Sequence, residues 1–151
     1  MKDPCDDIRD WIYATLNNAV SYGGSIVPVY SFPPSGVAKP YIVIGDHEAG
    51  EPEGVKDSYV WDVMTTIEIY TSFPNATNAS YLSLNSISTQ VLQLLVQRAY
   101  GGYGVEDGGV HFNNFHLISC RPTGMRTERR LSDTEIMLYK ELNINQLLEE
   151  L

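Results

Sequence analysis

The chain has 151 residues, of which 43% are hydrophobic and 19% are charged. This length suits one domain, so we expect a single domain over residues 1–151. The formal net charge of −9 argues against non-specific wrapping around DNA and against attachment to an anionic membrane, because both need a positive surface.

The N-terminal segment lacks the basic start and apolar core of a secretory signal, and no apolar run approaches the length of a membrane-spanning helix. We therefore expect a cytosolic protein without a membrane partner. Cys5 and Cys120 are far apart in the sequence and form no spaced framework. They indicate two free, partly buried thiols.

A first helix is expected from the capping residue Asp3 and from Pro4, which suits the first helical position. The helix is expected to end at Tyr22–Gly24. Its apolar residues recur at helical spacing and form one stripe: Ile8, Trp11, Ile12, Leu16, Ala19 and Val20. Such a stripe must pack against another element.

The segment Val27–Gly45 predicts a hairpin of two short strands. Pro33 and Pro34 end the first apolar run, and Pro40 begins the second. The segment 46–57 follows, with five acidic residues against one Lys, and it is expected to be a solvated loop or hairpin tip. Its acidic residues are Asp46, Glu48, Glu51, Glu53 and Asp57.

Residues 59–71 alternate between apolar and polar side chains, which predicts a long, half-buried antiparallel strand. A second helix is expected after it, with Asn75 or Thr77 as its cap and Gly101–Gly102 as its end. Its apolar stripe is Leu84, Ile87, Val91, Leu94 and Leu95.

Two more strands are expected, at Val110–Cys120 and Glu135–Ile144. The segment 121–133 between them is expected to be a loop, and it carries four Arg against two acids: Arg121, Arg126, Arg129 and Arg130. The tail 146–151 is either a short helical turn or a frayed end. These elements predict an α+β fold, with a single antiparallel sheet of four to five strands and two main helices packed on one face.

No pattern of catalytic residues emerges. There is no nucleophile elbow, and Gly101–Gly104 lacks the strand-to-helix context of a phosphate loop. His111 and His116 are expected on opposite faces of one strand, which does not suit a shared metal ion. Asp62 and Glu68 would lie about 20 Å apart at the rise of a strand, beyond direct cooperation. We therefore expect no enzyme, no cofactor and no metal site.

The distribution of charge has two interpretations. In a monomer, the acidic segment 46–57 and the basic segment 121–133 are simply solvated loops. In a ring, opposite charges on two sides of each subunit favour head-to-tail contacts between copies. On the second interpretation, the nine acidic and basic residues named above form the subunit or partner interface.

The order of the elements resembles the tail-completion proteins of long-tailed bacteriophages, also called tail terminators or head-to-tail joining proteins. The similarity runs from Asp6 to Ile144, and its clearest motif is Pro40–Gly45, PYIVIG. An N-terminal helix precedes this motif, and an acidic segment, a long alternating strand and a second helix follow it.

The resemblance implies a small α+β subunit of the virion tail or neck, assembled in the host cytoplasm. Copies would form a ring, with a hexamer expected, that binds the tail tube protein, stops tube polymerisation and offers a surface to the head connector. DNA would only pass through an acidic lumen, without specific binding. The alternatives are another neck or tail-tube component, or a small cytosolic ligand-binding domain or enzyme, which would be a monomer with a deep pocket.

Overall fold

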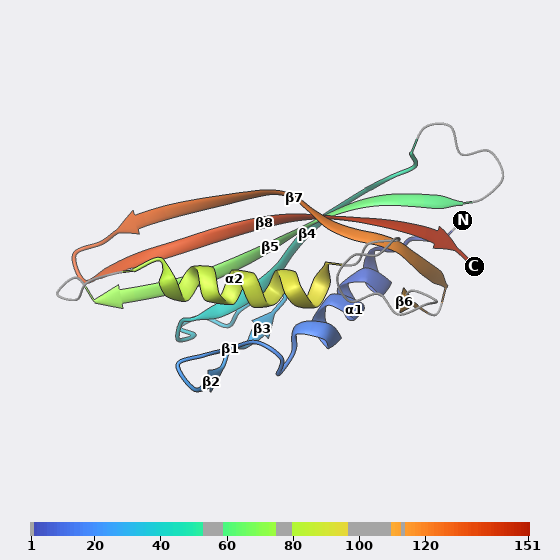
Figure 1. Ribbon diagram of the computed structural model, residues 1–151. Helices are drawn as coiled ribbons and strands as arrows, with labels where there is room; N and C mark the ends of the chain where they lie inside the picture. Colours follow the sequence, from blue (N-terminus) through green and yellow to red (C-terminus); the bar gives the residue numbers. More distant parts are fainter. Residues whose placement is uncertain (1, 53–58, 75–79, 97–109, 113) are drawn as a thin grey trace.

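A computed structural model describes residues 2–52, 59–74, 80–96, 110–112 and 114–151 (Figure 1). Its helices are α1 (Cys5–Leu16) and α2 (Leu82–Leu95). Its strands are β1 (Ser21–Tyr22), β2 (Ser25–Ile26), β3 (Val29–Tyr30), β4 (Tyr41–Gly50), β5 (Val60–Pro74), β6 (Val110–His111), β7 (Phe115–Leu131) and β8 (Glu135–Glu150).

One sheet with the strand order β3-β4-β5-β8-β7-β6 forms the frame of the molecule. Both helices lie on the same side of it (Figure 1). The predicted α+β class, with two helices on one face, is confirmed. The sheet has six strands where four to five were expected, because the two-residue strands β3 and β6 join its margins.

The centre of the sheet is the pair β5 and β8, which stay in antiparallel register from Val60↔Glu149 to Pro74↔Glu135. The strand predicted at 59–71 is therefore confirmed and runs slightly further. The strand predicted at 135–144 continues to Glu150, so the tail is neither a helical turn nor a frayed end. It remains extended because β5 and β7 pair with it on both sides.

The predicted hairpin at Val27–Gly45 is wrong, because β3 and β4 run parallel, with Val29 opposite Ile42. The connection from Ser31 to Pro40 is too long for a tight hairpin turn and carries the chain back to the same end of the sheet. A small hairpin lies earlier, where β1 and β2 flank Gly23 and Gly24, both with positive φ. The first helix accordingly ends at Leu16, before the predicted end.

Both charged segments contain strand where a loop, or for 46–57 a loop or hairpin tip, was expected. The structure extends β4 through 46–50, and β7 runs through 121–131. Pairing with β5 and β8 supplies their backbone hydrogen bonds and outweighs their polar composition. The strand predicted at Val110–Cys120 is instead divided between β6 and β7, which places His111 and His116 opposite each other on neighbouring strands.

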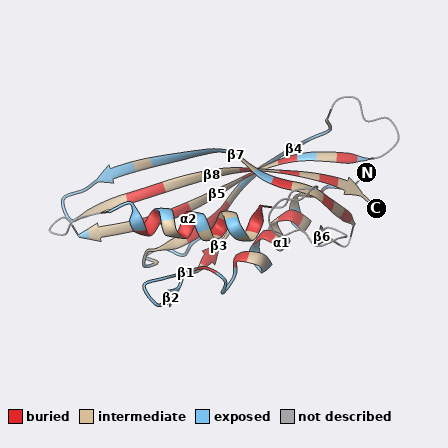
Figure 2. Cartoon of the chain, viewed as in Figure 1, coloured by how far each residue is buried: buried red, intermediate tan, exposed pale blue. Residues whose placement is uncertain are grey.

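The core lies between the helices and the covered face of the sheet (Figure 2). Helix α1 contributes Ile8, Ile12 and Leu16, which are fully buried. The buried apolar residues of α2 are Leu84, Ile87, Val91 and Leu95. Leu82, at the start of α2, is exposed. The predicted caps Asn75 and Thr77 and the predicted end at Gly101–Gly102 lie outside the described residues.

Gly45 lies where β4 shifts register, between Ile44 and His47. A Cβ atom at Gly45 would lie 2.9 Å from the backbone oxygen of Thr66 on β5. A side chain there would therefore force the two strands apart.

We predict that Gly45→Ala lowers the free energy of unfolding by about 1–3 kcal/mol, the usual cost of overpacking. Gly50→Ala on the same strand is the matched control, because its Cβ would meet nothing within 4 Å. Urea unfolding of both variants measures the difference. Equal stability of the two variants would contradict the close approach at Gly45.

Candidate functional site

The C-terminal part of β7 forms a long free edge of the sheet. Its inner side pairs with β8, whereas β6 covers its outer side only at His116 and Leu117. From Arg121 to Leu131 the outer side has no backbone partner among the residues that the structure describes. Figure 2 shows most of this stretch as exposed. We call residues 121–131 the basic edge.

The basic edge carries Arg121, Arg126, Arg129 and Arg130 against the single acid Glu128, a net charge of 4 − 1 = +3. Arg126 forms an ion pair with Glu141 at 3.2 Å, and Arg130 forms one with Glu128 at 3.5 Å. These exposed pairs contribute little stability. The same edge exposes 57% of Met125 and 68% of Leu131. It therefore offers both positive charge and apolar surface.

A second free edge lies on β4. Strand β3 covers β4 at Ile42 and Val43. Next to this pair, the guanidinium of Arg9 donates hydrogen bonds to the carbonyl oxygens of Ile44, at 2.9 Å, and Gly45, at 2.6 Å. Beyond Gly45, the outer side of β4 has no backbone partner in the described part of the chain.

We call residues 46–51 the acidic edge. Its exposed carboxylates are Asp46, Glu48 and Glu51, and it contains no Lys or Arg, so its net charge is −3. The predicted site residues Glu53 and Asp57 lie outside the described residues. The other seven predicted site residues are all exposed.

The structure keeps the two charged groups apart within one subunit. Strands β5 and β8 lie between β4 and β7, so the acidic and basic edges border opposite sides of the sheet. The sequence shows which segments are charged. It does not show that they lie on strand edges, because this depends on pairing with strands far away in the chain. In the described part of the chain, this arrangement leaves two edges of opposite charge exposed at the surface.

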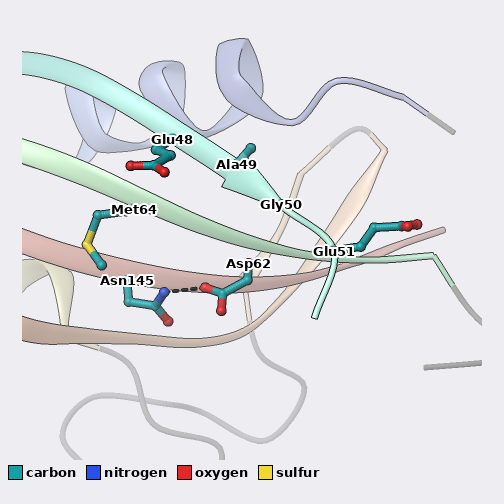
Figure 3. Close-up of a pocket in the computed structure, with 7 residues that line it drawn as sticks. All are labelled: Glu48, Ala49, Gly50, Glu51, Asp62, Met64 and Asn145. Carbon is teal, nitrogen blue, oxygen red and sulfur yellow. Dashed lines mark hydrogen bonds between the residues drawn. The ribbon is translucent and has the colours of Figure 1, made fainter. Parts of the chain in front are cut away.

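An open hollow of about 340 Å³ borders the acidic edge (Figure 3). It is lined by Glu48, Ala49, Gly50, Glu51, Asp62, Met64 and Asn145, and Asn145 donates a hydrogen bond to Asp62. Pockets for small molecules are enclosed and mostly apolar, whereas this hollow is open and lined by carboxylates. Among the described residues, no group of three or more His, Cys, Asp or Glu could hold a metal ion.

The sheet face away from the helices carries a row of tyrosines that sequence reasoning missed. Tyr30, Tyr41, Tyr70 and Tyr139 follow one another across four strands, with ring centroids 5.0–6.1 Å apart. The Tyr139 hydroxyl lies 3.2 Å from a carboxylate oxygen of Glu68 and 2.9 Å from one of Glu141. The only signal in the sequence was that Tyr70 and Tyr139 occupy polar positions of their alternating strands.

This network explains the state of its ionisable groups. Burial, reinforced by the nearby Glu68 carboxylate, raises the pKa of Tyr70 to about 12. Burial and the hydrogen bond with Glu141 raise the pKa of Tyr139 further. Both phenols therefore stay neutral and can donate hydrogen bonds to the carboxylates. Glu68 thus belongs to a tyrosine network and not to an acid–base pair with Asp62.

A buried polar row crosses the other face. The Nδ1 atom of His47 lies 2.8 Å from Thr65 Oγ1, which donates to Gln146 Oε1 at 3.1 Å. Thr65 and Gln146 are fully buried. Burial, followed by the positive charge of Arg9, lowers the pKa of His47. The nearby carboxylates of Asp46, Asp6 and Asp3 act in the opposite direction, and burial outweighs them, so the neutral imidazole is favoured.

Comparison with known proteins gives a similarity in fold. No protein-family model matches the chain, and no curated protein does. Its structure resembles a chain from a solved virion of a native gene transfer agent (GTA) particle, with a TM-score of 0.59 and 14% sequence identity. The match covers 91% of this chain and 84% of that one. At this identity, the similarity shows a common fold.

Neither helix among the described residues is long and apolar enough to cross a membrane. Cys120 is buried, Cys5 is partly buried, and both are free, so the prediction of two unpaired thiols is confirmed. Burial raises the pKa of Cys120 to about 12 and that of Cys5 to about 11. Both thiols are therefore poor nucleophiles near neutral pH.

The depressed pKa of His47 predicts a pH-dependent stability. Between the pKa of His47 in the folded chain and its ordinary pKa of 6.5, the unfolded chain binds more protons than the folded chain. The contribution of His47 to stability is therefore present above about pH 6.5, and it is lost as the pH falls through the folded pKa. His47→Gln, which keeps a hydrogen-bonding side chain, should show a weaker loss of unfolding free energy on acidification. Denaturant unfolding of both proteins from about pH 8 to 5 measures the difference. Parallel curves would contradict it.

Proposed function

We propose that this chain is a structural virion protein that caps a phage-like tail tube as a ring, that is, a tail terminator. The observation that carries the proposal is the common fold with a chain of the GTA virion, which extends over 91% of this chain. The sequence resemblance to tail-completion proteins over Asp6–Ile144 supports the more specific role. The virion tail or neck is then its location.

Two free edges of opposite charge support assembly into a ring. A subunit with one edge of each kind makes a different contact on each side, which is a head-to-tail interface. Such an interface closes into a ring when the rotation between neighbours divides a full turn. We propose six subunits, the number expected for tail terminators.

The proposed activity is binding and involves no covalent step. One rim of the ring would match the end of the tube of tail tube protein, and the other would bind the head connector. Polymerisation stops because the second rim does not recruit another tube subunit, which is specificity by differential affinity. The absence of an enclosed apolar pocket around the described acidic edge agrees with a binding surface.

A ring on the DNA path must let the genome pass. With a net charge of −9, the subunit repels the phosphate backbone and offers little non-specific affinity. We therefore propose that DNA passes through the lumen without specific contacts.

The decisive experiment combines sizing with tube capping. Native mass measured at several concentrations should show a ring that dissociates on dilution. Added to polymerising tail tube protein, the chain should shorten the tubes and appear at one end by negative-stain microscopy. A stable monomer at all concentrations would overturn the proposal. Self-assembly into long tubes would instead identify a tail-tube component.

Charge reversal on the basic edge provides a second test. Arg129→Glu with Arg130→Glu changes the charge of the basic edge from +3 to −1, so we expect loss of the ring at concentrations where the parent chain assembles. Lys140→Glu, which shifts the net charge by −2 against −4 for the double variant, is a control for half of the acidic shift, because Lys140 lies on the central strand β8 and contacts Asn85 of α2. Rings that persist in the Arg129/Arg130 variant would remove charge pairing from the proposal.

A further inference from the structure

We infer that neighbouring copies join by strand addition: the basic edge of one copy pairs with the acidic edge of the next as antiparallel strands, so that one sheet continues from subunit to subunit. The inference rests on the ring proposed above and names the contact that builds it. The occupant of each free edge is a second copy of this chain.

The backbone provides the first argument. A free strand edge presents a row of unpaired N–H and C=O groups, which is a template for another strand. Within one subunit, β4 runs antiparallel to β5, β5 to β8, and β8 to β7. Three reversals make β4 and β7 antiparallel to each other. Copies in the same orientation therefore place β7 beside the neighbouring β4 as an antiparallel pair, which continues the existing pattern.

Charge selects which edges meet. Two basic edges would bring +3 against +3, and two acidic edges −3 against −3, so both twofold pairings are repulsive. A basic edge against an acidic edge brings +3 against −3. Like charges therefore exclude the symmetric dimers that free edges otherwise favour, and only the head-to-tail contact remains attractive. That contact is the kind that closes into rings.

The register of the sheet adds a geometric condition. Val43 is opposite Glu68, Glu68 opposite Glu141, and Glu141 opposite Arg126, so Val43 and Arg126 are at the same level across the sheet. Strand β3 already covers Val43. A neighbour at the same level would therefore collide with β3, and the copies must be displaced along the strand direction. Such a stagger tilts strands relative to the axis of a closed sheet, as in β-barrels.

The side chains of the two edges are compatible with this contact. Glu48 is opposite Met64 on β5, and Met64 is opposite Asn145 on β8. Arg126 is opposite Glu141, which also lies on β8. Because side chains alternate along β8, Asn145 and Glu141 share one face, so Glu48 and Arg126 also lie on that face. On the basic edge, pairing would also cover the exposed side chains of Met125 and Leu131. Burial of this apolar surface favours association.

Two reversed-charge variants test the inference by complementation. The acidic-edge variant Glu48→Lys/Glu51→Lys has edges of +1 and +3, and the basic-edge variant Arg129→Glu/Arg130→Glu has edges of −3 and −1. Each variant alone brings like charges together. Mixed, they form two attractive contacts, +1 with −1 and −3 with +3, in an alternating ring. An even number of subunits allows this alternation.

Each variant alone should need a concentration at least about 100-fold above that of the parent chain for half-assembly, because like charges across an interface are strongly unfavourable. The equimolar mixture should recover rings, with native mass showing equal numbers of the two variants. Circular dichroism of each variant confirms that loss of assembly is not loss of folding. In parent rings, alternate amides along a part of 121–131 about as long as the acidic edge should gain protection from hydrogen exchange relative to the monomer.

The outcomes separate this inference from the proposed function. If the parent chain forms rings and caps tubes while the mixed variants fail to recover, or while amides 121–131 stay unprotected, the edge pairing is wrong and the capping role stands. If either variant alone still forms rings, the pairing is also overturned. If the parent chain never forms rings, the ring and the pairing fail together.

Discussion

The long antiparallel pairing of β5 with β8 is the constraint on which the rest of the structure depends. These strands stay in register from Val60 to Pro74, and the buried pair Thr65 and Gln146 links them by a hydrogen bond inside the core. Because β5 and β8 pair with each other, β4 pairs along its length only with β5, and β7 only with β8. Their outer sides are left to the two-residue strands β3 and β6. The free edges therefore follow directly from the way the centre is built.

Much of this architecture can be predicted from local patterns in the sequence. The alternation at 59–71 and 135–144 and the apolar stripe of α1 predict elements that the structure contains, and with them the α+β class. The parallel pairing of β3 could not be predicted, because it depends on where the connection from Ser31 to Pro40 leads. The strands in the charged segments could not be predicted for a related reason. Charged residues such as Arg129 and Glu48 are typical of loops, and here they lie in strands because distant strands supply their backbone hydrogen bonds. Their charges were predicted, but not their position on edges.

Charged residues at a sheet edge usually protect a protein from unwanted strand pairing. Arg121, Arg126, Arg129 and Arg130 do this against any other basic edge, and Pro122 and the adjacent register shift reinforce the effect. The same charges favour an acidic partner. In the proposed ring, protection and recognition would thus be two results of one charge distribution, and they would differ only in which edge approaches.

Arg9 sets a limit that the strands alone do not. Its guanidinium occupies the carbonyl oxygens of Ile44 and Gly45 and also donates to Ser31 Oγ at 3.0 Å, so it fills the gap between β3 and the acidic edge. A strand arriving from outside can extend along β4 only as far as this side chain. In the proposed strand pairing, Arg9 of helix α1 would therefore act as a stop that limits how many residues of β4 a neighbour can pair with, so the free edge would be a template of defined length.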